Sequence, residues 1–303
     1  MNKVAFICPI YDSRNHFQFG KELYKSKIDN NITADLYFIF SDEYQKDKFF
    51  SLIKDIGKES DFQYLMLPKK DQHFKSQVTI KKFFGLKCLK EKYDYLATID
   101  SETRFVKNVD YELLFDTMWK NQDLLKANRS PNGFFIMRQC FKTLGIYKNK
   151  ILREETGNYL YNIWFNDIPL YKSEVLDDFF HWLDELDDGY KNDWYCFEYY
   201  IFMAFLVIEK NYHIKKYDYE SLGGIMEYLY LFPQEKQYQI IRKLNSHWTS
   251  SDDCVVEQSS IRFHLDRDEN DLSYNSKDFD KQLRKNKIKR LLCLIKDYTR
   301  GEL

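Results

Sequence analysis

The chain has 303 residues, of which 44% are hydrophobic, 18% aromatic and 31% charged. This composition excludes an intrinsically disordered chain and supplies enough apolar surface for one large or two modest domains. The formal net charge of -1 argues against a protein that binds nucleic acid through an overall basic surface, so we expect no nucleic-acid partner.

The charge is unevenly distributed. Residues 277–303 contain nine Lys or Arg and four Asp or Glu, a local charge of +5 (9 minus 4), which leaves -6 for residues 1–276 (-1 minus 5). The sequence therefore predicts a large domain over residues 1–276, followed by a basic amphipathic helix over residues 277–303.

Cysteine usage and apolar run lengths predict a cytoplasmic protein. The six cysteines are scattered without a C-x-x-C pair, which favours buried free thiols in a reducing compartment over a zinc site. The apolar run at residues 4–10 is too short for a signal peptide. The longest apolar run elsewhere, residues 199–208, is far below the roughly 20 residues that span a bilayer.

The first hundred residues alternate between predicted strands and predicted helices. Short apolar runs predict strands at residues 4–10, 35–40, 62–67 and 93–100. The intervening segments have helical patterns: one from about His16 to Ile28, one after a Ser41-Asp42 N-cap with Phe49, Phe50, Ile53 and Ile56 on one face, and one with Val78, Phe83, Leu86 and Leu89. Such alternation is typical of an α/β fold with a mostly parallel sheet flanked by helices.

The alternation weakens after residue 110. Short strands are predicted at 124–128, 133–137 and 213–217, and helices at 172–188 and 193–211. The apolar residues of the last helix, which include Trp194, Phe197 and Phe205, are expected to face the core and are interpreted as packing rather than as a cofactor site.

Ligands of such sheets bind beyond the carboxyl ends of the strands, which makes the loops at 11–15 and 100–104 candidate site segments. No G-x-G-x-x-G follows the first strand, because the first glycine is Gly20, and no P-loop is present. An NAD enzyme and a P-loop kinase are therefore disfavoured. Asp100 and Glu102 instead place two carboxylates at the end of the fourth predicted strand, where a divalent cation and its phosphate ligand could bind.

Three segments together resemble the GT-A superfamily of nucleotide-sugar glycosyltransferases, in a form similar to bacterial capsule or lipooligosaccharide enzymes. They are Ile7-Cys8-Pro9-Ile10-Tyr11, residues 79–86 and Tyr95 to Phe105, and the late segment Ile261-Arg262-Phe263-His264-Leu265 also fits. The resemblance covers residues 1 to about 220 and implies a GT-A-like (Rossmann-like) sheet. The superfamily motif is usually D-x-D, and here the second carboxylate is Glu102.

The resemblance implies that Asp100 and Glu102 hold Mn²⁺ or Mg²⁺ against the diphosphate of a nucleotide sugar, with a UDP-sugar as the expected donor. It also implies a late histidine as a third metal ligand, for which His264 is preferred and His247 is the alternative. Structural histidines are the common alternative to both.

The donor is expected to contact the loop after the first strand. The loop from Pro9 to Arg14 would accept the nucleobase and ribose. Tyr11 would stack on the base, Asp12 would accept a hydrogen bond from base or ribose, and Arg14 would reach phosphate. The other donor-binding candidates, from the preceding helix and the acidic loop, are Lys81, Lys82, Asp100 and Ser101. A simple turn for the first loop and a solvated surface for the two lysines are the bland alternatives.

An inverting enzyme also needs a carboxylate base for the acceptor hydroxyl. Glu198 is preferred because aromatic neighbours would raise the pKa of its carboxyl group, and Asp193 is the alternative, with helix capping as its competing role. A retaining enzyme would need neither.

The expected activity is transfer of a sugar to a saccharide or lipid-linked acceptor in bacterial surface polysaccharide or lipooligosaccharide synthesis. The basic residues from Lys281 to Arg290 run into the apolar Leu291 to Ile295, which suits either peripheral contact with the anionic inner face of the cytoplasmic membrane or packing on the protein body. A sugar-phosphate nucleotidyltransferase and a non-catalytic carbohydrate-binding protein remain alternative functions.

Overall fold

The computed structural model describes residues 3–12, 16–57, 61–101, 103, 105, 109–122, 124–128, 131–156, 162–165 and 168–216, with Ile288, Leu292, Ile295 and Thr299. These residues fall into two compact units. The first contains the described residues up to 121 and those of 166–178, and the second contains those of 122–165 and 179–216 and the four late positions. The predicted boundary between residues 276 and 277 lies outside the described residues and stays a prediction.

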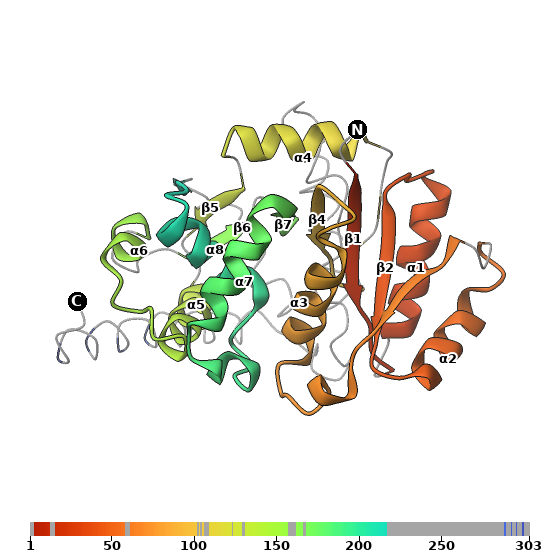
Figure 1. Ribbon diagram of the computed structural model, residues 1–303, viewed down its shortest axis with the longest axis horizontal. Helices are drawn as coiled ribbons and strands as arrows, with labels where there is room; N and C mark the ends of the chain where they lie inside the picture. Colours follow the sequence, from red (N-terminus) through yellow and green to blue (C-terminus); the bar gives the residue numbers. More distant parts are fainter. Residues whose placement is uncertain are drawn as a thin grey trace. The chain divides into compact units, whose positions relative to one another are not determined.

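The first unit is built on a five-stranded sheet with the order β3-β2-β1-β4-β7 (Figure 1). Its central strand is β1 (Val4–Pro9), which pairs in parallel with β2 (Asp35–Phe40) and β4 (Tyr95–Thr98). The strand β3 (Gln63–Met66) pairs in parallel with β2. The edge strand β7 (Leu170–Lys172) pairs antiparallel to β4. The predicted α/β class, a mostly parallel sheet flanked by helices, is confirmed.

Helices cover both faces of this sheet. Successive residues of β1 point to opposite sides, and all six are buried, so both faces need a covering layer. Phe6 packs edge-on against Tyr111 and Phe115 of α4 (Tyr111–Lys120), at centroid separations of 5.0 and 6.0 Å. Phe38, on the same face in β2, contacts Tyr24 of α1 (His16–Asp29) and Phe49 of α2 (Glu43–Ile53).

The opposite face is covered by α3 (Gln77–Leu89), which follows the short helix η2 (Lys69–Asp71). Gly85 lets α3 lie close to the sheet. A methyl group at this position would lie 2.7 Å from side-chain carbons of both Ile7 and Ile39, which is too close for contact without a shift. The missing side chain therefore brings the first turns of α3 down onto the ends of the central strands.

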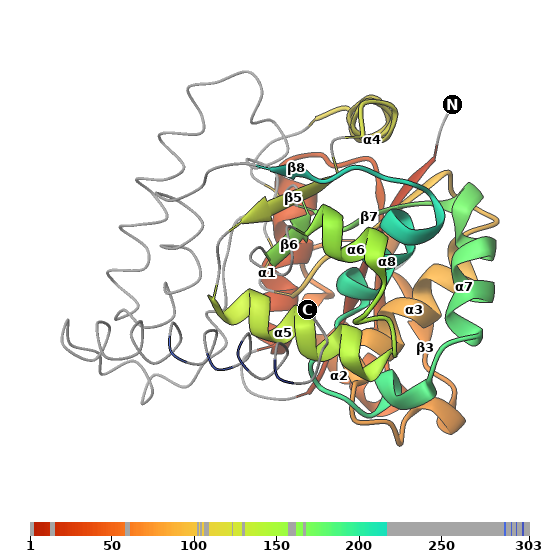
Figure 2. The ribbon, with the colours of Figure 1, turned by 90° about the vertical axis from the view of Figure 1, so that its left-hand side faces the viewer.

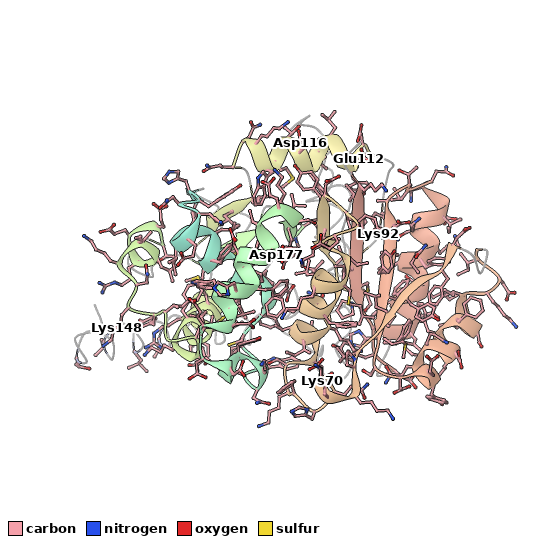
Figure 3. The ribbon with its side chains drawn as sticks, viewed as in Figure 1. Lys70, Lys92, Glu112, Asp116, Lys148 and Asp177 are labelled. Atoms are coloured by element: carbon pink, nitrogen blue, oxygen red, sulfur yellow. The ribbon has the colours of Figure 1, made fainter. Side chains whose placement is uncertain are left out.

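The strand order places a topological switch point between β1 and β4, since the chain adds β2 and β3 on one side of β1 before returning to the other. At the amino end of β4, the Tyr95 hydroxyl donates to Asp116 of α4 (3.0 Å), whose position is labelled in Figure 3. The backbone N–H of Lys3 donates to Asp94 (2.8 Å). These contacts fix the strand at the end away from the switch point.

The second unit contains a three-stranded sheet in which β5 (Leu125–Asn128) lies between antiparallel β6 (Asn162–Phe165) and parallel β8 (Lys215–Lys216), as Figure 2 shows. Its helices are α5 (Pro131–Thr143), α6 (Lys150–Glu155), η4 (Asp188–Lys191) and α8 (Glu198–Glu209). A 3₁₀ turn, η3 (Ser173–Val175), precedes α7 (Leu176–Asp184), and both units contribute residues to α7. Phe179 of α7 packs on Phe202 of α8 at 5.1 Å.

In this half of the chain one predicted strand is wrong, and two predicted helices have other bounds than expected. Residues 133–137 form part of α5 rather than a strand, and Pro131 at the first position of that helix is a favourable start that the apolar run obscured. The predicted helix 172–188 is divided between the end of β7, η3, α7 and η4. The predicted helix 193–211 is confirmed as α8 with a later start, at Glu198, and Phe197 is its N-cap. Trp194 therefore precedes the helix, and the expectation that it faces the core is wrong, because its side chain is 64% exposed.

Candidate active site

The described site candidates of the first unit gather at the carboxyl ends of β1 and β4. Pro9 ends β1 and Tyr11 follows it, while Asp100 and Ser101 follow β4. Arg14, Glu102, His247 and His264 lie outside the described residues, so their predicted roles stay predictions. The described part of the site is therefore the pair of loops at the switch point and the helix that packs beneath them.

Two consecutive lysines of α3 reach these two loops. Neighbouring helix residues point about 100° apart, so Lys81 and Lys82 diverge toward different loops. Lys82 Nζ lies 2.9 Å from Asp100 Oδ1, with 5% of the lysine side chain and 48% of the aspartate side chain exposed. A nearly buried ammonium group thus holds a carboxylate whose other side faces solvent.

Lys81 contacts the loop after β1 instead. Its Nζ donates to the carbonyl oxygen of Ile10 (2.6 Å) and lies 3.9 Å from the centre of the Tyr11 ring, a cation–π contact. Lys81 has no exposed surface, so it fixes the position of Tyr11 from below. A direct contact between Lys81 and a donor stays a prediction.

Burial lowers the pKa of the Lys81 ammonium group to about 7, while the nearby carboxylate of Asp42 and then Cys8 act in the opposite direction. The group is hydrogen-bonded yet shielded from water, and this desolvation penalises its charged form. Near neutral pH, the lysine beneath the loop therefore titrates, in contrast to an ordinary surface lysine.

We expect the free energy of unfolding to rise between about pH 7 and pH 10 because of Lys81. In this range the folded protein has released a proton that the unfolded chain still binds at a pKa near 10.5, so stability rises with pH, by up to about 1.4 kcal/mol per pH unit. Lys81→Met should remove this rise, as measured by urea unfolding across the range. Lys87→Met, an exposed position of the same helix, is the control, and equal pH slopes for Lys81→Met and wild type would contradict the assignment.

The loops after β1 and β4 are also linked through His16, the first residue of α1. His16 Nδ1 and Ser101 Oγ share a hydrogen bond of 3.0 Å, and the His16 ring packs edge-on against Tyr11 at 5.9 Å. No sequence pattern marks His16 as a site residue, apart from its place at the start of the first helix. This contact joins Tyr11 and Ser101, two predicted donor-binding residues, in one cluster.

Asp12 is held by an ion pair on the outer side of the same loop. Lys48 Nζ of α2 lies 2.8 and 2.7 Å from the two carboxylate oxygens of Asp12. Both side chains are partly exposed, at 49% and 30%. A base or ribose that hydrogen-bonds to Asp12 would therefore meet a carboxylate already paired with Lys48, and the role of Asp12 in donor binding stays a prediction.

The chemistry of Asp100 fits a divalent cation in part. Mg²⁺ is usually bound by one or two carboxylates together with substrate phosphate oxygens, and Asp100 offers one such carboxylate. Among the described residues, no group of three or more His, Cys, Asp or Glu side chains could hold a metal ion. The remaining predicted ligands, Glu102 and His264, are not among those residues.

The two candidate bases lie in the second unit, on either side of a turn. Asp193 Oδ2 accepts a hydrogen bond from the Thr143 hydroxyl of α5 (2.5 Å), and Asp193 Oδ1 accepts one from the backbone N–H of Tyr195 (2.9 Å). The predicted capping of the helix by Asp193 is wrong, because α8 begins five residues later. Glu198 is the first residue of α8 and is fully buried, where the positive end of the helix dipole favours a carboxylate.

No family model and no curated protein sequence matches the chain. Solved structures similar to it include mouse xyloside xylosyltransferase 1 in its apo form, with 10% identity over 71% of this chain and 85% of that chain and a TM-score of 0.41. An active-site mutant of LgtC is similar with 14% identity over 71% and 72% and a TM-score of 0.40. The mannosyltransferase Ktr4p from S. cerevisiae is similar with 12% identity over 61% and 60% and a TM-score of 0.35. These values are low, so the function is inferred below from the residues of the chain itself.

Within the described part of the chain, no helix is long and apolar enough to cross a membrane.

Proposed function

We propose that the protein is a glycosyltransferase that moves a sugar from a nucleotide-sugar donor, expected to be a UDP-sugar, to a saccharide acceptor. The observation that carries this proposal is the pairing of nearly buried Lys82 with half-exposed Asp100, 2.9 Å apart, at the switch point of the sheet. An α/β sheet of this kind binds its ligands there. The resemblance of this loop and its preceding helix to GT-A enzymes supports the same activity.

The charges of this pair suit a donor diphosphate. The Lys82 ammonium group is held beside the loop that follows β4, where a phosphate oxygen could replace or share its carboxylate partner. Asp100 would hold Mn²⁺ or Mg²⁺, with Glu102 and His264 as the other proposed ligands. Such a cation neutralises negative charge on a leaving nucleotide.

The loop after β1 would form the nucleoside side of the site. Tyr11 is fixed by Lys81 below it and by the His16 ring beside it. A ring held on two sides loses little conformational freedom when a base stacks on it. Ser101, joined to His16, would border the same space from the β4 loop.

A screen of nucleotide sugars by thermal shift, with and without Mn²⁺, tests the activity. A bound donor should raise the unfolding temperature by mass action, and the same donor should be slowly hydrolysed. A sugar-phosphate nucleotidyltransferase would instead respond to a nucleoside triphosphate with a sugar phosphate. A carbohydrate-binding protein would respond to neither set of nucleotides.

We further propose that the C-terminal segment contacts an anionic membrane, where it would meet a lipid-linked acceptor of surface polysaccharide or lipooligosaccharide synthesis. Ile288, Leu292 and Ile295 are helical and 57%, 59% and 50% exposed. Their spacing of four and three residues places them on one helix face. In the sequence, the basic residues of 281–290 flank this apolar stripe, a combination typical of interfacial helices.

Replacement of Ile288, Leu292 and Ile295 together by serine should abolish co-sedimentation with vesicles that contain about one third phosphatidylglycerol. Neutral phosphatidylcholine vesicles should sediment little protein in either form. Deletion of residues 278–303 provides the limiting case. Equal sedimentation of wild type, triple variant and truncated chain would contradict membrane contact through this segment.

A further inference from the structure

A tight turn from Asp193 to Phe197 leads into α8. The backbone N–H of Cys196 donates to the Asp193 carbonyl oxygen (3.1 Å), and the N–H of Phe197 donates to the Tyr195 carbonyl oxygen (3.1 Å). The Asp193 carboxylate accepts hydrogen bonds from the backbone N–H of Tyr195, inside the turn, and from the Thr143 hydroxyl of α5. The turn is therefore fixed both internally and against a neighbouring helix.

This fixed turn presents two aromatic side chains to solvent. Trp194 is 64% exposed and Tyr195 is 38% exposed. The Tyr195 ring packs edge-on against Phe135 of α5 at a centroid separation of 5.7 Å. An exposed indole forgoes the stabilisation that burial of its apolar surface would give. Exposed aromatic groups on a turn whose backbone is fixed are typical of binding surfaces, because little ordering of the backbone is needed when a ligand binds.

The charge around the turn selects against an anionic ligand. Residues 184–194 contain five Asp or Glu and one Lys, a local charge of -4 (1 minus 5). The four acidic residues that precede the turn, Asp184, Glu185, Asp187 and Asp188, are all exposed. A nucleotide or an anionic membrane would be repelled here, and two side chains offer far less than the roughly 1,200 Å² of a stable protein interface.

We propose that Trp194 and Tyr195 form the platform on which the acceptor saccharide stacks. A sugar ring is uncharged, has an apolar face of C–H groups for an aromatic ring and carries hydroxyl groups at its rim for the acidic surroundings. Trp and Tyr provide large amphipathic contact area at low entropic cost. The platform rests on the proposed transferase function, and its turn leads directly into Glu198, the base preferred from the sequence. Asp193 is then a positioning residue that acts through the turn.

The test uses the full chain without donor and titrates the methyl glycosides of galactose, mannose and xylose by ligand-observed NMR. Trp194→Ala should raise the dissociation constant of a bound glycoside about tenfold or more. Trp194→Phe, which keeps a flat ring, should raise it only about twofold. Tyr64→Ala is the matched control, because Tyr64 is 41% exposed on β3 in the other unit. The Tyr64→Ala variant should bind the glycoside with the same dissociation constant as the wild type.

Failure of the platform and failure of the transferase function give different results. Absence of glycoside binding by the wild type, or equal binding by Trp194→Ala and wild type, overturns the platform even if a nucleotide sugar is hydrolysed. Loss of glycoside binding in Trp194→Ala supports the platform, and it does so even if no nucleotide sugar binds, an outcome that overturns the transferase instead. Thermal unfolding of each variant shows that the chain is folded.

Discussion

Asp100→Asn should lower the rate of nucleotide-sugar hydrolysis about a hundredfold or more, because it removes the negative charge proposed to hold the metal while keeping the size of the side chain. The measurement is release of free nucleotide from the donor found in the thermal-shift screen. Asp94→Asn is the matched control. It changes the carboxylate at the other end of β4, which accepts a hydrogen bond from Lys3, and should leave the rate unchanged.

A second explanation of such a loss has to be separated, since Asp100 also pairs with Lys82. Removing the aspartate leaves a nearly buried ammonium group without that carboxylate, which is costly in itself. In a Lys82→Met background this cost is absent. If Asp100 binds metal or donor directly, Asp100→Asn should still lower the rate in that background. If Asp100 only neutralises Lys82, the second substitution should have no further effect.

Two more measurements test the roles of Asp100 and Lys82. Asp100→Ala should lower the unfolding temperature more than Asp100→Asn, and Lys82→Met should restore part of that loss, because the pair is removed together. The Mn²⁺ concentration that gives half-maximal hydrolysis should rise in Asp100→Asn. An unchanged Mn²⁺ requirement together with unchanged hydrolysis would contradict the role of Asp100.

The sheet of the first unit could be predicted from the sequence because its strands are covered on both faces. All six residues of β1 are buried, and such strands are continuous apolar runs that stand out from amphipathic helices. Asp42 was also readable as an N-cap, and its side chain accepts from the backbone N–H of Gln45. Ile56 does not belong to the apolar face of α2 as predicted, because that helix ends at Ile53.

The second unit was harder to predict because its short elements give no periodicity. Residues 133–137 are apolar in an uninterrupted run, which is compatible with a strand or a buried helix, and Pro131 decides for α5. The start of α8 depended on the side chain of Asp193, which bonds to Tyr195 two residues later instead of capping a helix. Asp and Asn commonly form either arrangement.

From the sequence, the location of the candidate site could be predicted only to the loops that follow the strands. Asp100 stood out because it follows a buried strand, but the partner of Asp100 depends on which way each lysine points. A lysine pair in a sequence is usually solvated, whereas Lys81 is fully buried beneath the first loop and Lys82 is nearly so. Gly85 sets how closely α3 approaches the strands. These are properties of packing between distant segments, which local patterns do not contain.

Glu198→Gln should lower the rate of transfer to an acceptor glycoside about a hundredfold or more, and lower donor hydrolysis less. Glutamine keeps the size of glutamate but cannot accept a proton at neutral pH, whereas an attacking water molecule can pass its proton to bulk water. Glu198 is fully buried, so this role requires the acceptor to enter among the side chains that cover the first turn of α8. The measurement compares glycoside product with free nucleotide in the same reaction.

The same helix provides the control, and the preceding turn provides the alternative base. Glu209→Gln changes the last residue of α8, which is exposed, and should leave both products unchanged. Asp193→Asn should weaken acceptor binding and lower the unfolding temperature, because Asp193 accepts from Thr143 and Tyr195, but it should leave the maximal transfer rate within about tenfold of wild type. If transfer survives in Glu198→Gln and is lost in Asp193→Asn, the roles are reversed. If both variants transfer normally, neither carboxylate acts as the base, as expected of a retaining mechanism.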